Sequence, residues 1–151
     1  MKPVMRLPFL TALPLALALP AFASADAPVR KPQSHTLLQT QGAWDGSRYP
    51  AWPTGQPQIT TLRVEIAPHS TLPWHVHPMP SSGYVLQGEL AIEDRDSGKR
   101  RRFIAGQAFT ETVDTVHRGH TGAGTTVLLL TYMGTPGQAI SIPAAGEPPE
   151  F

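Results

Sequence analysis

The middle of the chain alternates apolar and polar residues with a period of two, which is typical of half-buried β-strands. The first such segment begins at Ile59 and ends before Pro68. Its apolar face is formed by Leu62, Val64 and Ile66. A second segment runs from about residue 84 to 93, and Gly88 interrupts it, which predicts a bend or a close approach of another backbone. The expected apolar face of this segment consists of Tyr84, Leu86, Leu90 and Ile92.

Residues 96–99 (Asp-Ser-Gly-Lys) have the sequence of a tight turn, because Gly98 can supply the positive φ that a three-residue hairpin loop needs. We therefore expect strands near 89–95 and 99–105 to pair with each other. The run 99–102 is basic, but acidic residues should lie within cross-strand distance of it. These acidic residues are Glu93, Asp94 and Asp96. A solvated hairpin with neutralised charges is thus a better interpretation than a binding patch.

Residues 127–133 form a nearly continuous apolar run, which is too short for a typical helix and predicts a buried strand. The 17 prolines and 13 glycines in 151 residues also argue against long helices. About six to eight short strands separated by turns predict an all-β sandwich or barrel. A chain of this length fits one domain better than two.

The N-terminus has the layout of a secretory signal peptide, with a basic start, an apolar stretch from Leu7 to Phe22 and small residues around position 23. The alternative is a membrane anchor. However, an apolar stretch of about 16 residues broken by prolines falls short of the roughly 20 residues that span a bilayer. We therefore expect cleavage near residues 23 to 25 and a periplasmic or secreted protein, with no membrane contact afterwards. The absence of cysteine excludes disulfides and lipid attachment at the cleavage site.

These patterns divide the chain into a signal peptide at 1–23, a flexible polar lead-in at 24–34, a domain at 35–142 and a flexible tail at 143–151. Loss of Lys2 and Arg6 with the signal peptide leaves 10 basic and 11 acidic residues, a net charge of −1. That balance predicts no electrostatic binding to nucleic acid or to an anionic membrane.

Candidate chemistry begins with His75 and His77, which are two residues apart. On a strand this spacing puts both imidazoles on one face, while Trp74 and Val76 point the other way. Two neighbouring imidazoles can bind one metal ion, although such a pair alone is a weak indication of a metal site. His117 is the candidate for a third ligand.

At these residues the chain resembles the cupin superfamily. The family's first motif places a glycine before His-x-His and a glutamate and a glycine after it, and the second runs from a glycine through Pro-x-Gly to a histidine. His75, His77 and Gly88 match the first motif, and Gly106 and His117 match the second, so that the resemblance spans about 59–133. It implies a cupin-type conical β-barrel, also called a jelly roll or double-stranded β-helix. It also implies a homodimer and a divalent transition metal bound inside by the three histidines.

Four motif positions differ from the family pattern. Ser81 stands where the first motif has its glutamate, which is usually the fourth ligand, and His69 stands at that motif's opening glycine. Thr112 and Asp114 replace the proline and the glycine of the second motif, so we expect these turns to be made differently. Three neutral imidazoles without a carboxylate should bind their ion less tightly and leave it more electrophilic.

Glu111 is a candidate replacement for the missing carboxylate, because it lies on the segment that leads towards His117. There it could approach the ion or act as a general base. The alternative is a surface glutamate at a strand end, since glutamate is usually exposed. The remaining histidines are interpreted as turn or surface residues, although His69 could support a ligand if its turn folds back. They are His35, His69 and His120.

Several cupins are similar in using three histidines alone, with Fe(II), to activate dioxygen. The resemblance therefore implies a metal-dependent dioxygenase that acts on a small organic molecule such as a phenolic compound or a diketone. Iron is the expected ion, with manganese, nickel, copper and zinc as alternatives, because first-row ions compete for the same imidazoles. The competing hypothesis is a non-catalytic periplasmic cupin that binds a metal or a small ligand.

Overall fold

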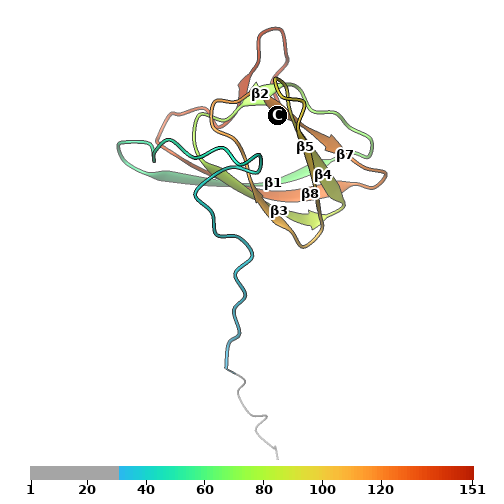
Figure 1. The fold of residues 1–151 in the computed structure, drawn as a ribbon, viewed down its shortest axis with the longest axis horizontal. Helices are drawn as coiled ribbons and strands as arrows, with labels where there is room; N and C mark the ends of the chain where they lie inside the picture. The colour runs from blue at the N-terminus through green and yellow to red at the C-terminus, as the bar shows by residue number, and fades with distance from the viewer. Residues whose placement is uncertain (1–30) are drawn as a thin grey trace, which may run out of the picture. The chain divides into compact units, whose positions relative to one another are not determined.

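The computed structural model describes residues 31–151, within which His35–Phe151 form one compact unit. The expected signal peptide and most of the expected lead-in lie outside the described residues. The described chain contains no helix and forms two sheets whose strands pair antiparallel (Figure 1). Accordingly, no helix between residues 31 and 151 is long and apolar enough to cross a membrane. The expected all-β fold is confirmed.

The first sheet has the strand order β1-β8-β3-β6. Its strands are β1 (Gln58–Ile66), β3 (Ser81–Gln87), β6 (Ala108–Thr110) and β8 (Thr126–Gly134). The apolar run at 127–133 lies in β8, which pairs with β1 along its whole length and with β3 on its other side. β8 is thus the buried strand that its composition predicts.

The second sheet has the strand order β5-β4-β7-β2-β9. Its strands are β2 (His75–Val76), β4 (Glu89–Asp94), β5 (Arg100–Ile104), β7 (His117–Thr121) and β9 (Ile142–Pro143). The short strand β2 lies between β7 and β9. Because β9 belongs to this sheet, the segment after β8 returns to the barrel beside β2, as the red ribbon in Figure 1 shows.

Apolar side chains from both sheets meet in one core. The alternation on β1 is as predicted, since Ile66 is buried, Val64 is half-buried, and Arg63 and Glu65 are exposed. The buried residues of the core are Trp44, Ile66, Met79, Val85, Leu90, Ile92, Phe103, Phe109, Leu128, Leu130 and Tyr132. This core fills part of the space between the sheets and leaves one end for the histidines.

The segment predicted as one strand over residues 84–93 is two strands in different sheets. Gly88 separates β3 from β4 with a φ of 75°, and a side chain there would lie 2.6 Å from the carbonyl oxygen of Thr125. Glycine is therefore required where the chain crosses from one sheet to the other. The bend that the sequence indicated at this position is the crossing itself.

The predicted inward face of this segment is wrong for its first half. Leu90 and Ile92 are buried as expected, but Leu86 is 44% exposed and Tyr84 is only half-buried, while Val85 is fully buried. The pairing of β3 with β8 shifts register after Val85. Such an irregularity moves the following side chains to the opposite face, so a single period of two cannot describe both strands.

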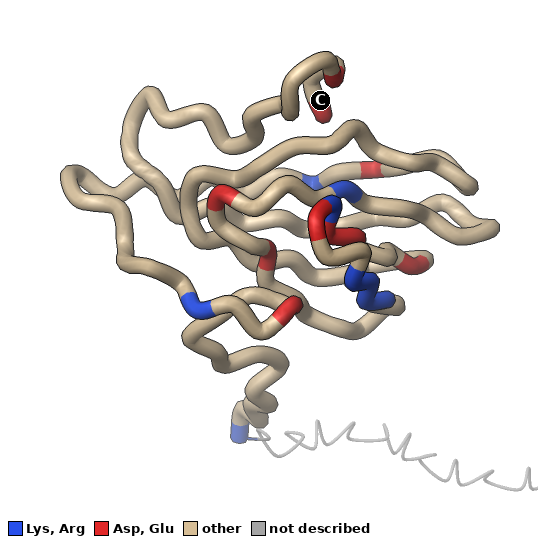
Figure 2. Tube along the Cα trace, turned by 45° about the horizontal axis from the view of Figure 1, so that its top comes forward, with Lys and Arg blue, Asp and Glu red and all other residues tan. Residues whose placement is uncertain are grey.

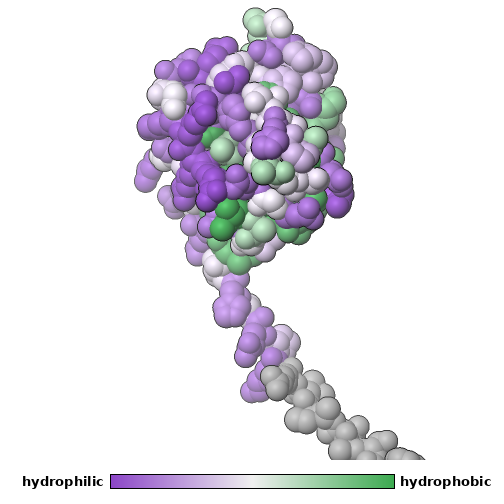
Figure 3. Space-filling view, turned by 90° about the vertical axis from the view of Figure 1, so that its right-hand side faces the viewer, coloured by the Kyte–Doolittle hydropathy of each residue, from purple (hydrophilic) through white to green (hydrophobic). Residues whose placement is uncertain are grey.

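The charged hairpin between β4 and β5 forms as predicted. Arg100 lies opposite Glu93, and their side chains approach to 2.6 Å. Arg102 reaches Glu89 at 2.6 Å. Basic and acidic positions accordingly lie side by side in Figure 2, and the face in Figure 3 is mainly hydrophilic with smaller apolar patches. Two of the four basic residues of the run are thus paired with acidic residues of the same hairpin.

The two residues that stand at glycine positions of the motifs, His69 and Asp114, have the backbone conformation that glycine favours. His69 has a φ of 54° and Asp114 a φ of 55°. Their backbone amides donate to carbonyl oxygens, that of His69 to Gly122 at 2.8 Å and that of Asp114 to His77 at 3.0 Å. These hydrogen bonds hold both residues in a conformation that costs roughly 1–2 kcal/mol without glycine.

Gly83 is required by the packing of Phe109. A Cβ at position 83 would lie 2.1 Å from Cζ of the Phe109 ring, which is itself buried and tilted against the ring of Phe103. We expect Gly83→Ala to lower the free energy of unfolding by about 1–3 kcal/mol through overpacking, measured by urea denaturation. Gly124→Ala is the control, since no atom lies within 4 Å of its Cβ. Equal stability of the two variants would contradict this packing.

Candidate metal centre

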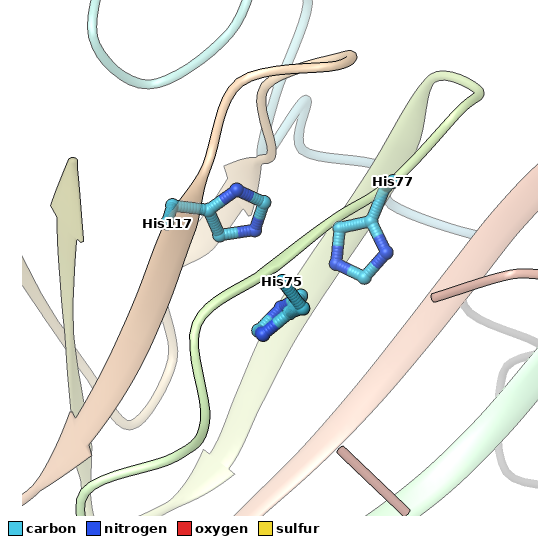
Figure 4. Close-up of side chains that lie close together, drawn as sticks. All are labelled: His75, His77 and His117. Carbon is cyan, nitrogen blue, oxygen red and sulfur yellow. The ribbon is translucent and has the colours of Figure 1, made fainter. Parts of the chain in front are cut away.

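Three buried histidines converge at one end of the barrel. His75 lies on β2 directly opposite His117, the first residue of β7, and His77 follows β2 on the same face as His75. The ring centroids are 4.6, 4.9 and 5.1 Å apart, and one nitrogen from each ring lies within 4.8 Å of the others. Figure 4 shows the three rings turned towards a common point. The structure thus brings together the three residues that the sequence singled out.

Each ring is oriented by a hydrogen bond from Nδ1 to a backbone carbonyl. The acceptors for His75, His77 and His117 are the carbonyl oxygens of Pro73, Ile140 and Thr115, at 2.8, 2.6 and 2.8 Å. A carbonyl oxygen can only accept, so each Nδ1 carries a hydrogen and each neutral ring presents a lone pair on Nε2. This arrangement is how proteins fix the tautomer of metal-binding histidines.

The three Nε2 atoms fit a metal ion. All three are buried and have no hydrogen-bond partner among the described residues. A buried polar atom without a partner costs about 1–3 kcal/mol, so three of them at one place need a common explanation. A divalent transition metal would satisfy all three, because imidazole nitrogen is a preferred ligand of these ions.

Glu111 belongs to this centre. It follows β6, and its side chain is buried, so its interpretation as a surface glutamate is wrong. Its Oε2 lies 3.1 Å from Nε2 of His77, without hydrogen-bond alignment, and accepts a hydrogen bond of 2.9 Å from the hydroxyl of Ser81. Ser81 thus contributes an oriented hydroxyl at the motif's glutamate position, and the carboxylate comes from Glu111, directly after the neighbouring strand β6.

Burial and charge set the protonation of the metal-free centre. Burial alone lowers the pKa of His77, but the adjacent Glu111 carboxylate outweighs it and raises that pKa to about 9. Burial alone raises the pKa of Glu111, but the charge on His77 holds it well below its usual range. Burial lowers the pKa of both His75 and His117. One proton therefore resides on His77, and the other two rings are neutral.

Glu150 is a second carboxylate at the centre, which the sequence did not indicate. Its Oε1 lies 3.3 Å from Nε2 of His75, and its Oε2 accepts a hydrogen bond of 2.6 Å from the hydroxyl of Ser141. The side chain is 4% exposed, and this burial raises its pKa. The segment predicted as a flexible tail thus places a carboxylate on the site. No motif marks Glu150, although it and Glu147 are the only charged residues after Gly134.

A cavity of about 350 Å³ adjoins the centre. His75, His117, Glu111 and Glu150 contribute to its wall. Aliphatic side chains supply much of the remainder, among them Val64, Ile66, Leu72, Leu90, Leu128 and Leu130. Cavities of this size and composition bind small organic molecules.

The other histidines take no part in the centre. His120 lies on β7 with its Nε2 2.8 Å from Glu93 and its Nδ1 3.2 Å from the hydroxyl of Thr71. His35 and His69 are exposed. His35 and His69 thus agree with their interpretation as turn or surface histidines, whereas His120 is half-buried within a strand. On β7 the spacing of three residues turns His120 away from the face that His117 occupies.

Residues 62–133 match a family model described as "Cupin domain", and this range includes the three histidines and Glu111. The chain belongs to the cupin superfamily. A comparison with curated proteins finds no match for this cupin. Its two antiparallel sheets agree with the jelly-roll fold expected from the resemblance.

Three solved structures show the range of similar proteins. An oxalate oxidase in complex with the substrate analogue glycolate is 28% identical, with a TM-score of 0.44, over 49% of this chain and 41% of that chain. DMSP lyases are 15% identical, with a TM-score of 0.50, over 57% and 44%. An RmlC-like cupin from Shewanella frigidimarina is 18% identical, with a TM-score of 0.44, over 52% and 68%. The cupin therefore spans less than half of the oxidase and lyase chains.

Metal binding should release about one proton per ion at pH 7.5, because the proton on His77 must leave before its Nε2 can bind. In Glu111→Gln the carboxylate that raises the pKa of His77 is absent, so proton release should fall close to zero at this pH. Above about pH 9 the wild type should also release little. Calorimetry in buffers of different ionisation enthalpy measures the number of protons. Equal proton release by the wild type and Glu111→Gln would contradict the pairing of His77 with Glu111.

Proposed function

We propose that this cupin is a metal-dependent enzyme acting on a small organic molecule, with His75, His77 and His117 as metal ligands. The observation that carries this proposal is the convergence of three buried Nε2 atoms without hydrogen-bond partners, each on a ring oriented through Nδ1. A divalent transition ion, with iron as the first choice, would supply Lewis-acid and redox chemistry at this point.

Glu111 supplies the carboxylate that the family takes from the position of Ser81. Its Oε2 is fixed by the Ser81 hydroxyl and lies beside Nε2 of His77, so its negative charge offsets part of the charge of the ion. Glu111 also lines the cavity, where it can accept a proton from a bound molecule as a general base. The same group therefore serves the ion and the substrate.

For the reaction we propose oxidation by dioxygen of a phenolic compound or a diketone. The residues that line the cavity offer acid–base groups but no serine, cysteine or lysine as a nucleophile. A bound ion would supply the Lewis-acid and redox chemistry that these side chains lack. The aliphatic walls exclude water from the reacting groups, which strengthens their electrostatic interactions.

A non-catalytic metal- or ligand-binding module is the competing proposal. One observation favours it, namely that Glu150 covers part of the site from the chain itself. Elemental analysis after purification without added metal separates the two proposals. A stoichiometric iron, manganese, copper or nickel ion supports the enzyme, and zinc or no metal supports the module.

We also propose that the protein is exported, on the basis of its N-terminal layout. Mass spectrometry of the protein from a secreting host should then find a mature N-terminus near residues 24–26. An intact N-terminus in the exported fraction would contradict cleavage.

Replacing His77 with alanine should lower metal affinity at least about tenfold, because one of three ligands is lost. His120→Ala is the matched control, since His120 lies on β7, as His117 does, but contacts Glu93 instead of the centre. Metal content is measured by mass spectrometry on both variants and on the wild type. Equal metal content in His77→Ala and the wild type would overturn the assignment of His77 as a ligand.

If Fe(II)-loaded protein consumes no oxygen with a broad panel of phenols and diketones, the dioxygenase proposal is wrong.

Exchanging the residues at positions 81 and 111 tests the origin of the carboxylate. Glu111→Ser should weaken metal binding about tenfold, and the double variant with Ser81→Glu should recover most of the loss, because it restores the family's arrangement. Glu147→Ser is the control, since that half-buried side chain makes no hydrogen bond or ion pair with the residues of the centre. If the double variant binds metal no better than Glu111→Ser, the two positions are not interchangeable and this account of Glu111 is wrong.

A further inference from the structure

Glu150 occupies a position that is costly for a carboxylate. Its side chain is 4% exposed, and its only polar contacts among residues 31–151 within hydrogen-bond or ion-pair distance are the hydroxyl of Ser141 and Nε2 of His75. A buried carboxylate with one hydrogen-bond donor and a neutral imidazole beside it is poorly compensated. A positive ion beside His75 would therefore stabilise the negative charge of the Glu150 carboxylate.

Glu150 differs from Glu111 in how the chain holds it. Glu111 follows β6, and its backbone amide donates to Ser81 in β3. Glu150 lies seven residues after the end of β9. The amide of Ala144 donates a hydrogen bond to the carbonyl oxygen of Trp74. After Ala144, no backbone hydrogen bond joins residues 145–151 to the barrel. Glu150 can thus leave its position without breaking a sheet.

A second anion would neutralise a divalent ion bound at the centre. Three neutral imidazoles add no charge, so a divalent ion with Glu111 alone would keep a net charge of +1. In the structure Glu150 supplies a second carboxylate at Nε2 of His75, on the side where the cavity lies. A carboxylate from a bound molecule can supply the same charge at the same place.

We propose that this cupin binds a small monocarboxylate, whose head group takes the place of the Glu150 carboxylate and whose apolar body lies in the adjoining cavity. This inference rests on the proposed function, because the bound ion makes the head-group position favourable to an anion. The body is apolar because aliphatic side chains line the cavity, including Leu72, Leu90 and Leu128. Phe151 also lines the cavity, so departure of Glu150 would open it further.

Hexanoate and its neutral counterpart hexanamide are suitable probes, with zinc-loaded protein to avoid redox chemistry. Calorimetric titration should show that Glu150→Ala binds hexanoate about tenfold more tightly than the wild type, because the probe no longer competes with an internal carboxylate. Glu150→Ala should also prefer hexanoate to hexanamide by at least about tenfold, since only the anion offsets the ion's charge. Glu147→Ala removes a half-buried carboxylate of the same segment that does not line the cavity, and it should leave both affinities unchanged.

A second variant avoids truncating the carboxylate. Ser141→Ala removes the hydroxyl that holds Oε2 of Glu150, so hexanoate affinity should rise, by less than in Glu150→Ala. Zinc content and the melting midpoint are measured on every sample to establish that each variant is folded and loaded. If zinc is bound but Glu150→Ala gains no hexanoate affinity, or binds hexanamide equally well, the inference is wrong and the proposed function stands. If no sample binds zinc, both are overturned.

Discussion

Hydrogen bonds from three histidine Nδ1 atoms to backbone carbonyls are the constraint on which the site depends. They set the orientation of His75, His77 and His117 and leave the three Nε2 atoms facing one another in a buried space. One acceptor, the carbonyl of Ile140, comes from the segment after β8, so this segment completes the site as well as covering it. The barrel supplies the remainder, because β2 and β7 place two of the rings in direct register.

The sequence predicted much of this arrangement because strand periodicity and motif spacing are local properties. The spacing of His75 and His77 implied a shared face, and the match of His117 to the second motif located the third ring. The apolar alternation on β1 and the turn of the charged hairpin were equally local signals. Each of these features depends on neighbours within a few residues along the chain.

Other features depend on contacts between distant segments, and the sequence could not give them. The change of inward face after Val85 arises from the pairing of β3 with β8, which no local pattern records. Burial of Glu111 requires the Ser81 hydroxyl, 30 residues away. Glu150 reaches His75 only because β9 pairs with β2. Average exposure of glutamate predicted a surface position for Glu111, and a specific hydrogen bond overrides that average.

The central claim is that three imidazoles and one carboxylate surround a single metal ion. X-ray absorption at the metal edge of the purified, metal-loaded protein tests it directly, because imidazole rings give a characteristic outer-shell scattering. The account predicts three histidine ligands and at least one oxygen ligand in the wild type. A spectrum with one imidazole or none would contradict it.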